Sequence, residues 1–131
     1  MRVQIEDEWN GWDGDTIVEL TNGRFFRQTD YHYEYMYAYR PLATLEDGKL
    51  HVDGMSGGIR VHEISPVVSN VRGEWTGWDG ETVVELDNGQ VWQQAVYKYE
   101  YRYAYRPKVV IDGNDMLVEG MEGPVRVRRV K

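Results

Sequence analysis

The stretch EWNGWDGDTIVELTNG (residues 8–23) recurs almost unchanged as EWTGWDGETVVELDNG (residues 74–89). The same displacement of 66 residues aligns residues 8–64 with residues 74–130 without a gap, and 28 of these 57 positions are identical. A chain that repeats one unit at a fixed period folds as copies of one supersecondary structure. The sequence therefore predicts a tandem duplication.

The segment SPVVSNVRG between the aligned copies has the composition of a connector. It contains Pro66 and Gly73 together with serine and asparagine, which are typical of turns and loops. We therefore expect a first repeat at residues 1–64, a linker at residues 65–73 and a second repeat at residues 74–131.

Within each copy the local signals are those of β-strands. The dipeptides Asn22-Gly23 and Asn88-Gly89 lie between alternating segments, a pattern typical of a hairpin with a type I′ turn. The segment TIVEL (residues 16–20) alternates with a period of two residues, and no window of ten or more residues keeps an apolar period of 3.6. The chain is therefore predicted to be all-β, with almost no helix.

A single sheet of about 57 residues leaves its edge strands open, and closure into a barrel removes those edges. We expect five or six strands in each copy and two tandem SH3-like small barrels related by pseudo-twofold symmetry. In such barrels the tryptophans and aliphatic residues shared by both copies form the cores; they are Trp9/Trp75, Trp12/Trp78, Val18/Val84 and Leu20/Leu86.

Three features retained in both copies carry a family resemblance: GWDG followed by an acidic residue and threonine, then EL-x-NG, then an aromatic run that ends in YRP. With these features the chain resembles a family of small uncharacterised bacterial β proteins, some of them encoded on integron gene cassettes. The resemblance covers most of each repeat. It implies an SH3-like fold and a bacterial cytoplasmic protein, and it implies no activity and no functional residues.

The composition restricts the partners that we expect. The formal net charge of −7 disfavours nucleic acid as a partner, because an acidic chain repels phosphate. The one basic cluster, VRVRRVK (residues 125–131), alternates like a strand with a charged, solvated face. No cysteine is present and no apolar run approaches the length of a membrane helix, so we expect a soluble cytoplasmic protein without a membrane partner.

The run YHYEYMYAYRP (residues 31–41) places tyrosine at every second position and recurs as YKYEYRYAYRP (residues 97–107). In a strand, this period places the five tyrosines of each run on one face, spread over ~26 Å. All ten tyrosines of the chain lie in the two runs. Two small cores cannot bury ten phenols with satisfied hydroxyls, so we expect some of them to line a groove or an interface.

Three interpretations of this face stay open. The tyrosines could simply cover a barrel with their hydroxyls in water. They could form a self-association surface, since tyrosine is enriched in interface cores. They could also bind a small planar or sugar-like ligand. We expect a homo-oligomer, with a dimer favoured, or an unlike protein partner. The candidate ligand or interface residues are Tyr31, Tyr33, Tyr35, Tyr37, Tyr39, Tyr97, Tyr99, Tyr101, Tyr103, Tyr105, Gln28, Gln94, Arg40 and Arg106.

The charges between the tyrosines suggest one pairing of the two runs. If the runs paired antiparallel with positions that sum to 140, Glu34 would face Arg106 and Arg40 would face Glu100. Cross-strand ion pairs of this kind favour one register by roughly 0.2–1 kcal/mol each. Such pairing would dock the two repeats, or two chains by exchange.

Catalytic signatures are absent from the sequence, and we expect no cofactor and no metal. The strongest enzymatic candidates are the acidic turns Asp13/Asp15 and Asp79/Glu81, where carboxylates could act in a small hydrolase or hold a cation. The same Asp-Gly dipeptides are ordinary turn chemistry. The sequence therefore predicts a non-enzymatic binding or protein-interaction module, with the small hydrolase or metal-dependent enzyme as the alternative.

Overall fold

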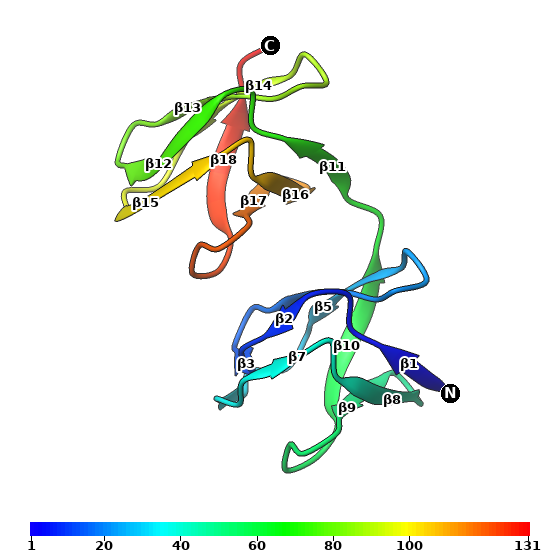
Figure 1. Ribbon diagram of the computed structural model, residues 1–131. Coiled ribbons are helices and arrows are strands. Elements are labelled where there is room, and N and C mark those ends of the chain that lie inside the picture. Colours follow the sequence, from blue (N-terminus) through cyan, green and yellow to red (C-terminus); the bar gives the residue numbers. More distant parts are fainter. The chain divides into compact units, whose positions relative to one another are not determined.

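The computed structural model describes residues 1–131 and contains strands but no helix, which confirms the all-β prediction (Figure 1). The chain divides into two compact units, Met1–Ser65 and Pro66–Lys131. No helix in the structure has the length and apolarity that crossing a membrane requires.

The first unit is built on a six-stranded antiparallel sheet in the order β1-β8-β9-β10-β5-β4. Two short ribbons accompany this sheet, one formed by β2 with β7 and the other by β3 with β6. The strands of this unit are β1 (Arg2–Gln4), β2 (Glu8–Trp9), β3 (Trp12–Asp13), β4 (Ile17–Glu19), β5 (Phe25–Gln28), β6 (Tyr33–Glu34), β7 (Ala38–Tyr39), β8 (Leu42–Glu46), β9 (Lys49–Val52) and β10 (Ile59–Ile64).

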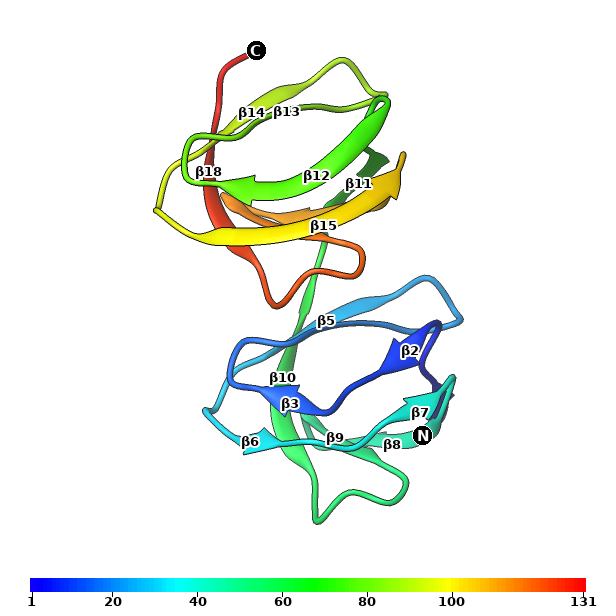
Figure 2. The same ribbon diagram turned by 60° about the vertical axis from the view of Figure 1, so that its left-hand side comes forward.

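The second unit repeats this plan with the sheet order β11-β16-β17-β18-β14-β13. One longer ribbon of β12 and β15 takes the place of the two short ribbons (Figure 2). The strands of this unit are β11 (Val67–Asn70), β12 (Glu74–Asp79), β13 (Val83–Glu85), β14 (Val91–Gln94), β15 (Tyr99–Tyr105), β16 (Lys108–Asp112), β17 (Asp115–Val118) and β18 (Val125–Arg129).

In each unit the two end strands of the six-stranded sheet are joined to each other. An isolated bridge links Ile5, just after β1, to Leu20, just after β4, and the matching bridge links Val71 to Leu86. Backbone hydrogen bonds flank the first bridge, with Thr21 N donating to Gln4 O at 2.9 Å. These bonds pair backbone groups that an open sheet would leave exposed at its edges.

The expected linker at residues 65–73 is in part a strand. Residues 67–70 form β11, which pairs antiparallel with β16 as β1 pairs with β8 in the first unit. The two strands have little sequence in common, and of their side chains only Val3 is buried. The structural repeat thus begins before Glu74, where the sequence identity begins.

The Asn-Gly turns also differ from the prediction. Gly23 has a positive φ of 86°, whereas Asn22 does not, so the turn is not type I′. Gly23 N donates to Leu20 O at 3.0 Å and Leu20 N donates to Arg24 O at 2.9 Å. This is the longer hairpin loop in which a type I turn is followed by a left-handed glycine. Gly89 N and Leu86 O repeat the first bond at 3.0 Å.

Each core is organised around a perpendicular pair of tryptophans. Trp9 and Trp12 meet edge to face with their centroids 5.0 Å apart, and Trp75 and Trp78 do the same. Residues three apart face opposite sides of a regular strand, but the ladder shifts register between Trp75 and Gly77. The shift turns both indoles inward, where all four tryptophans are at most 3% exposed. Val18/Val84 and Leu20/Leu86 are buried beside them, as predicted.

Candidate functional site

We call β2, β3 and β12 the tryptophan strands, and β6, β7 and β15, which pair with them, the tyrosine strands. The ten tyrosines lie on the solvent side of the two runs that contain the tyrosine strands. Every one of them is exposed, with accessible fractions from 54% at Tyr37 and Tyr103 to 81% at Tyr31. We call the five in each unit the tyrosine face of that unit: Tyr31, Tyr33, Tyr35, Tyr37 and Tyr39 in the first, and Tyr97, Tyr99, Tyr101, Tyr103 and Tyr105 in the second. The period of two residues thus sets the orientation of these side chains.

The residues between the tyrosines point to the other side of the strand. Met36 and Ala104 pack against the cores of their units. In the second unit the run forms one strand, β15, whereas in the first it is divided into β6 and β7 around residues 35–37. The exposure of the tyrosines still alternates without interruption through this gap.

The tyrosine strands pair with the tryptophan strands of their own units, which overturns the register that sums to 140. Trp9 pairs with Ala38 and Trp75 pairs with Ala104. The four charged residues of that hypothesis bind partners within their own units instead. These partners are Ser56 and His32 for Glu34, Glu6 for Arg40, Lys98 and the Glu122 amide for Glu100, and Asp87 for Arg106.

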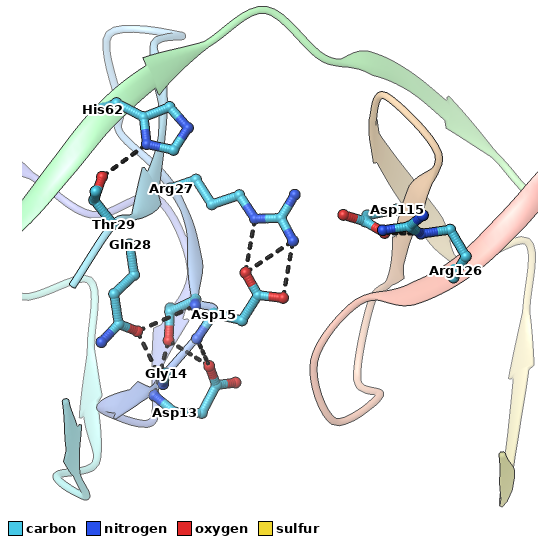
Figure 3. Close-up of polar contacts among 10 residues, drawn as sticks. Asp13, Gly14, Asp15, Arg27, Gln28, Thr29, His62, Asp115 and Arg126 are labelled. Atoms are coloured by element: carbon cyan, nitrogen blue, oxygen red, sulfur yellow. Dashed lines mark hydrogen bonds and ion pairs between the residues drawn. The ribbon is translucent and has the colours of Figure 1, made fainter. Parts of the chain in front are cut away.

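A buried glutamine in each unit fixes where the tyrosine run begins; Figure 3 shows Gln28 of the first unit beside the Asp-Gly turn. Gln28 is 4% exposed, and its Oε1 accepts hydrogen bonds from the backbone N–H groups of Gly14 and Thr16 at 3.0 and 3.2 Å. Its Nε2 donates to the carbonyl oxygens of Asp30 and His32 at 3.0 and 2.9 Å. The amide therefore ties the Asp-Gly turn to the first residues of the tyrosine run.

Gln94 makes the same four contacts in the second unit. Its Oε1 accepts from Gly80 N and Thr82 N, and its Nε2 donates to Val96 O and Lys98 O, all at 2.9–3.3 Å. Both donor hydrogens and the carbonyl oxygen are thus used on backbone partners. Gln28 and Gln94, predicted as polar neighbours of a ligand, are positioning residues and do not line the face.

The two arginines also act away from the tyrosine faces. Arg40 and Arg106 have left-handed backbones, with φ of 50° and 52°, in the turns that end the tyrosine strands. Side-chain amides hold these turns, since Gln4 Nε2 donates to Arg40 O at 3.0 Å and Asn70 Nδ2 donates to Arg106 O at 2.9 Å. The guanidinium of Arg40 donates to Glu6 O, and that of Arg106 binds the Asp87 carboxylate.

The first tyrosine of each run covers the Asp-Gly turn. A Cβ atom at Gly14 would lie 2.8 Å from the ring of Tyr31, and one at Gly80 would lie 2.9 Å from the ring of Tyr97. Only glycine leaves room for the ring in this position. The first aromatic ring of each face thus packs against the glycine of the turn.

Glutamates of the tryptophan strands complete the faces. The hydroxyl of Tyr37 donates to Glu8 Oε1 at 3.3 Å, and that of Tyr103 donates to Glu74 Oε1 at 3.3 Å. The charge of Glu74, followed by desolvation, raises the pKa of the Tyr103 hydroxyl. Desolvation, followed by the charge of Glu8, raises the pKa of Tyr37. The sequence analysis did not identify either glutamate as part of the site. Both occupy the same position of the repeat, immediately before a core tryptophan.

The acidic turn of the first unit binds its own backbone and neighbouring side chains (Figure 3). Asp13 Oδ1 accepts from Asp15 N and from the Thr16 hydroxyl, both at 2.8 Å, which is the turn chemistry expected of Asp-Gly. Asp15 forms a two-pronged ion pair with Arg27 at 2.8–2.9 Å. The two carboxylates therefore serve different partners.

The turn of the second unit has the same pattern. Asp79 Oδ1 accepts from Glu81 N at 2.9 Å and from the Thr82 hydroxyl at 2.8 Å. The bond from the Glu81 amide, followed by that from Thr82, lowers the pKa of Asp79. No group of three or more histidine, aspartate or glutamate side chains in the structure could hold a metal ion.

Comparison of the chain with protein-family models, with curated proteins and with solved structures gives no match. The functional argument therefore rests on the geometry of the two units.

Proposed function

We propose that this chain is a non-enzymatic binding module that recognises a protein partner through its tyrosine faces. One observation carries the proposal: all ten tyrosines are exposed, while tryptophan and aliphatic side chains fill both cores. A row of solvent-facing aromatic rings stabilises a small β unit little, because it buries little apolar area. Contiguous exposed apolar surface is typical of interaction sites.

The framework of each unit also suits a recognition role. Hydrogen bonds from side-chain amides to the backbone hold each tyrosine run at both ends and do not involve the phenol rings. The amides belong to Gln28 and Gln4 in the first unit and to Gln94 and Asn70 in the second. Because the backbone under each face is already fixed, the face loses little conformational freedom on binding. Tyrosine itself combines a large contact area with a polar hydroxyl.

For the framework itself we propose an SH3-like small barrel in each unit. The antiparallel order of six strands and the bridges that join the sheet ends support this assignment, as does the resemblance carried by the repeated motifs. The chain would then present the same kind of face twice, on two barrels of the same design.

A second copy of this chain is one form of partner, and light scattering tests it. We would measure the molar mass in solution for the wild type and for a Tyr35→Ser/Tyr101→Ser variant. A dimer that dissociates on substitution would place the faces in a self-association interface. A monomer in both cases leaves the faces free for an unlike partner.

A peptide-selection experiment tests the function independently of the partner's chemistry. Peptides of random sequence would be selected on the wild-type chain and counter-selected on a variant with serine at Tyr33, Tyr35, Tyr99 and Tyr101. We expect sequences that bind the wild type alone. If both proteins are monomeric and no peptide distinguishes them, the tyrosine faces are not binding sites. Circular dichroism of the variant provides the folding control, because the substituted side chains are exposed.

A further inference from the structure

The tyrosine faces carry negative charge and no positive charge. In the second unit the ladder sets Glu74 opposite Tyr105 and Asp79 opposite Tyr99, and both carboxylates lie on the exposed side of β12. The third exposed residue of this strand is Thr76, which is neutral. The row of phenol rings in this unit is therefore bordered by two carboxylates.

The first unit has the same arrangement. Glu8 pairs with Tyr39 and Asp13 pairs with Tyr33, and the exposed residue between the two carboxylates is Asn10. The pattern survives in both copies although Thr76 and Asn10 differ. Two carboxylates and five phenol rings are thus the shared composition of the faces.

The cations near the tyrosines are directed elsewhere. Arg102 lies between Tyr101 and Tyr103 in sequence, but its guanidinium packs on Gly120, where an added Cβ would be 2.3 Å from Nε. Lys98 donates to Glu122 O at 2.7 Å and lies 3.4 Å from Glu100. Neither cation neutralises the carboxylates that border the rings.

Aromatic rings flanked by carboxylates are complementary to cations. A guanidinium or ammonium group is attracted to the face of a phenol ring, and nearby carboxylates strengthen that attraction. The charge of Glu74 is the largest cause of the raised pKa of the Tyr103 hydroxyl, and at Tyr37 the charge of Glu8 adds to the larger effect of desolvation. Two like faces brought together would set carboxylate against carboxylate, which disfavours face-to-face self-association.

The spacing of the rings matches an extended polypeptide. Alternate residues of a strand are about 6.6 Å apart, so the tyrosines recur at that interval along β15. The alternate side chains of an extended peptide recur at the same interval. Such a peptide aligned with the strand can therefore place one cation over each successive ring.

We propose that each tyrosine face binds an extended polypeptide segment that carries arginine or lysine at alternate positions. This inference rests on the proposed binding function and names the chemistry of the partner. Because both units carry the face, one chain binds one segment per unit.

Synthetic peptides of equal charge test the inference by isothermal titration calorimetry on the full chain. One peptide carries arginines at alternate positions separated by serine, and the other carries the same arginines in one uninterrupted block. We expect the alternating peptide to bind one copy per unit and at least several-fold more tightly than the block. Equal affinity for the two peptides would overturn the proposed spacing, and no binding of either would overturn the inference.

Matched variants separate recognition from general attraction to an acidic chain. Serine at Tyr33, Tyr35, Tyr99 and Tyr101 should weaken binding at least about tenfold, whereas phenylalanine at the same positions should preserve most of it. Unchanged binding by the serine variant would show attraction to the net charge alone and would overturn the inference.

The carboxylates have a control of equal charge. Glu8→Gln/Glu74→Gln should weaken binding several-fold and reduce its dependence on salt. Glu46→Gln/Glu122→Gln changes the net charge equally, at exposed side chains outside the tyrosine strands and their partner strands, and should leave the affinity unchanged. Equal effects of the two pairs would contradict the proposed site.

The peptide selection described above distinguishes the two proposals. Peptides that require the tyrosines but lack alternating cations would support the binding function and overturn the inference about the partner. If a neutral sugar, and no peptide, binds the wild type, both the inference and the proposed protein partner are overturned.

Discussion

In the first unit Glu34 holds the loop after β9 while bonded to His32, whereas in the second unit the matching Glu100 holds the equivalent loop beside Lys98. Glu34 Oε2 accepts from the backbone N–H of Ser56 at 3.0 Å. Its Oε1 accepts from the Ser56 hydroxyl at 2.6 Å and lies 3.0 Å from His32 Nε2. One carboxylate thus connects the tyrosine strand to a loop and to a titratable ring.

In the second unit a lysine, Lys98, replaces that ring. Glu100 Oε2 accepts from Glu122 N at 3.1 Å, and Lys98 Nζ donates to Glu122 O at 2.7 Å. The bond from carboxylate to loop amide is kept, and the side chain beside the carboxylate differs between the units. This bond therefore belongs to the shared framework, while the histidine partner is particular to the first unit.

The largest effect of a single substitution on the shared framework is expected at Gly77 in β12 and at the matching Gly11 between β2 and β3. A Cβ atom at Gly11 would lie 2.0 Å from the carbonyl oxygen of Glu34, and one at Gly77 would lie 2.0 Å from that of Glu100. Gly11→Ala and Gly77→Ala should therefore each cost on the order of 3–5 kcal/mol of unfolding free energy. Urea denaturation measures the loss.

Gly57→Ala is the matched control, because an added Cβ meets nothing within 4 Å there. It should change the unfolding free energy by less than about 0.5 kcal/mol. A large loss at Gly77 with tolerance at Gly11 would mean that the divided ribbon of the first unit is not equivalent to the continuous ribbon of the second.

The glutamines provide a second, smaller test of equivalence. Gln28→Leu and Gln94→Leu each leave buried backbone donors and acceptors without partners, at a cost of about 2–3 kcal/mol. Denaturant unfolding should show similar losses for both variants. Gln93→Leu, on the opposite and more exposed side of β14, should cost less than about 1 kcal/mol. Unequal losses at the two buried sites would break the equivalence of the units.

Much of the fold could be predicted from the repeat and from periods of two residues. The alternation of tyrosines indicated which side chains share a side of the strand, because a strand has only two sides. The alternation does not show whether that side faces solvent or a partner strand. The type of the Asn22-Gly23 turn could not be predicted either, because several loop lengths accept the same dipeptide.

The site was predicted less well, because residue type alone does not show where a polar group finds its partners. Gln28 and Arg40 lie near the tyrosines in sequence, yet both are engaged by backbone. Glu8 lies 29 residues from Tyr37, and only the pairing of β2 with β7 brings the two together. Contacts of this kind depend on register, which the sequence pattern did not specify.

The smallest expected effect concerns the titratable contact of the first unit. The bond from His32, followed by that from Ser56, holds the pKa of Glu34 below its ordinary value of 4.5. The unfolded chain therefore binds more protons at this group than the folded chain does. The stabilisation is complete above about pH 4.5 and is lost as the pH falls through the folded pKa.

An NMR titration of the Ser56 amide measures this pKa directly, because Ser56 N donates to the carboxylate. From neutral pH to about pH 3, the amide shift should change with a midpoint below 4.5. His32→Ala removes the largest cause of the lowered pKa, so the midpoint should move up towards 4.5. A wild-type midpoint at or above 4.5, or one that His32→Ala leaves in place, would mean that the imidazole does not distinguish the units. Glu34 and Glu100 would then share the loop bond and differ only in the neighbouring side chain.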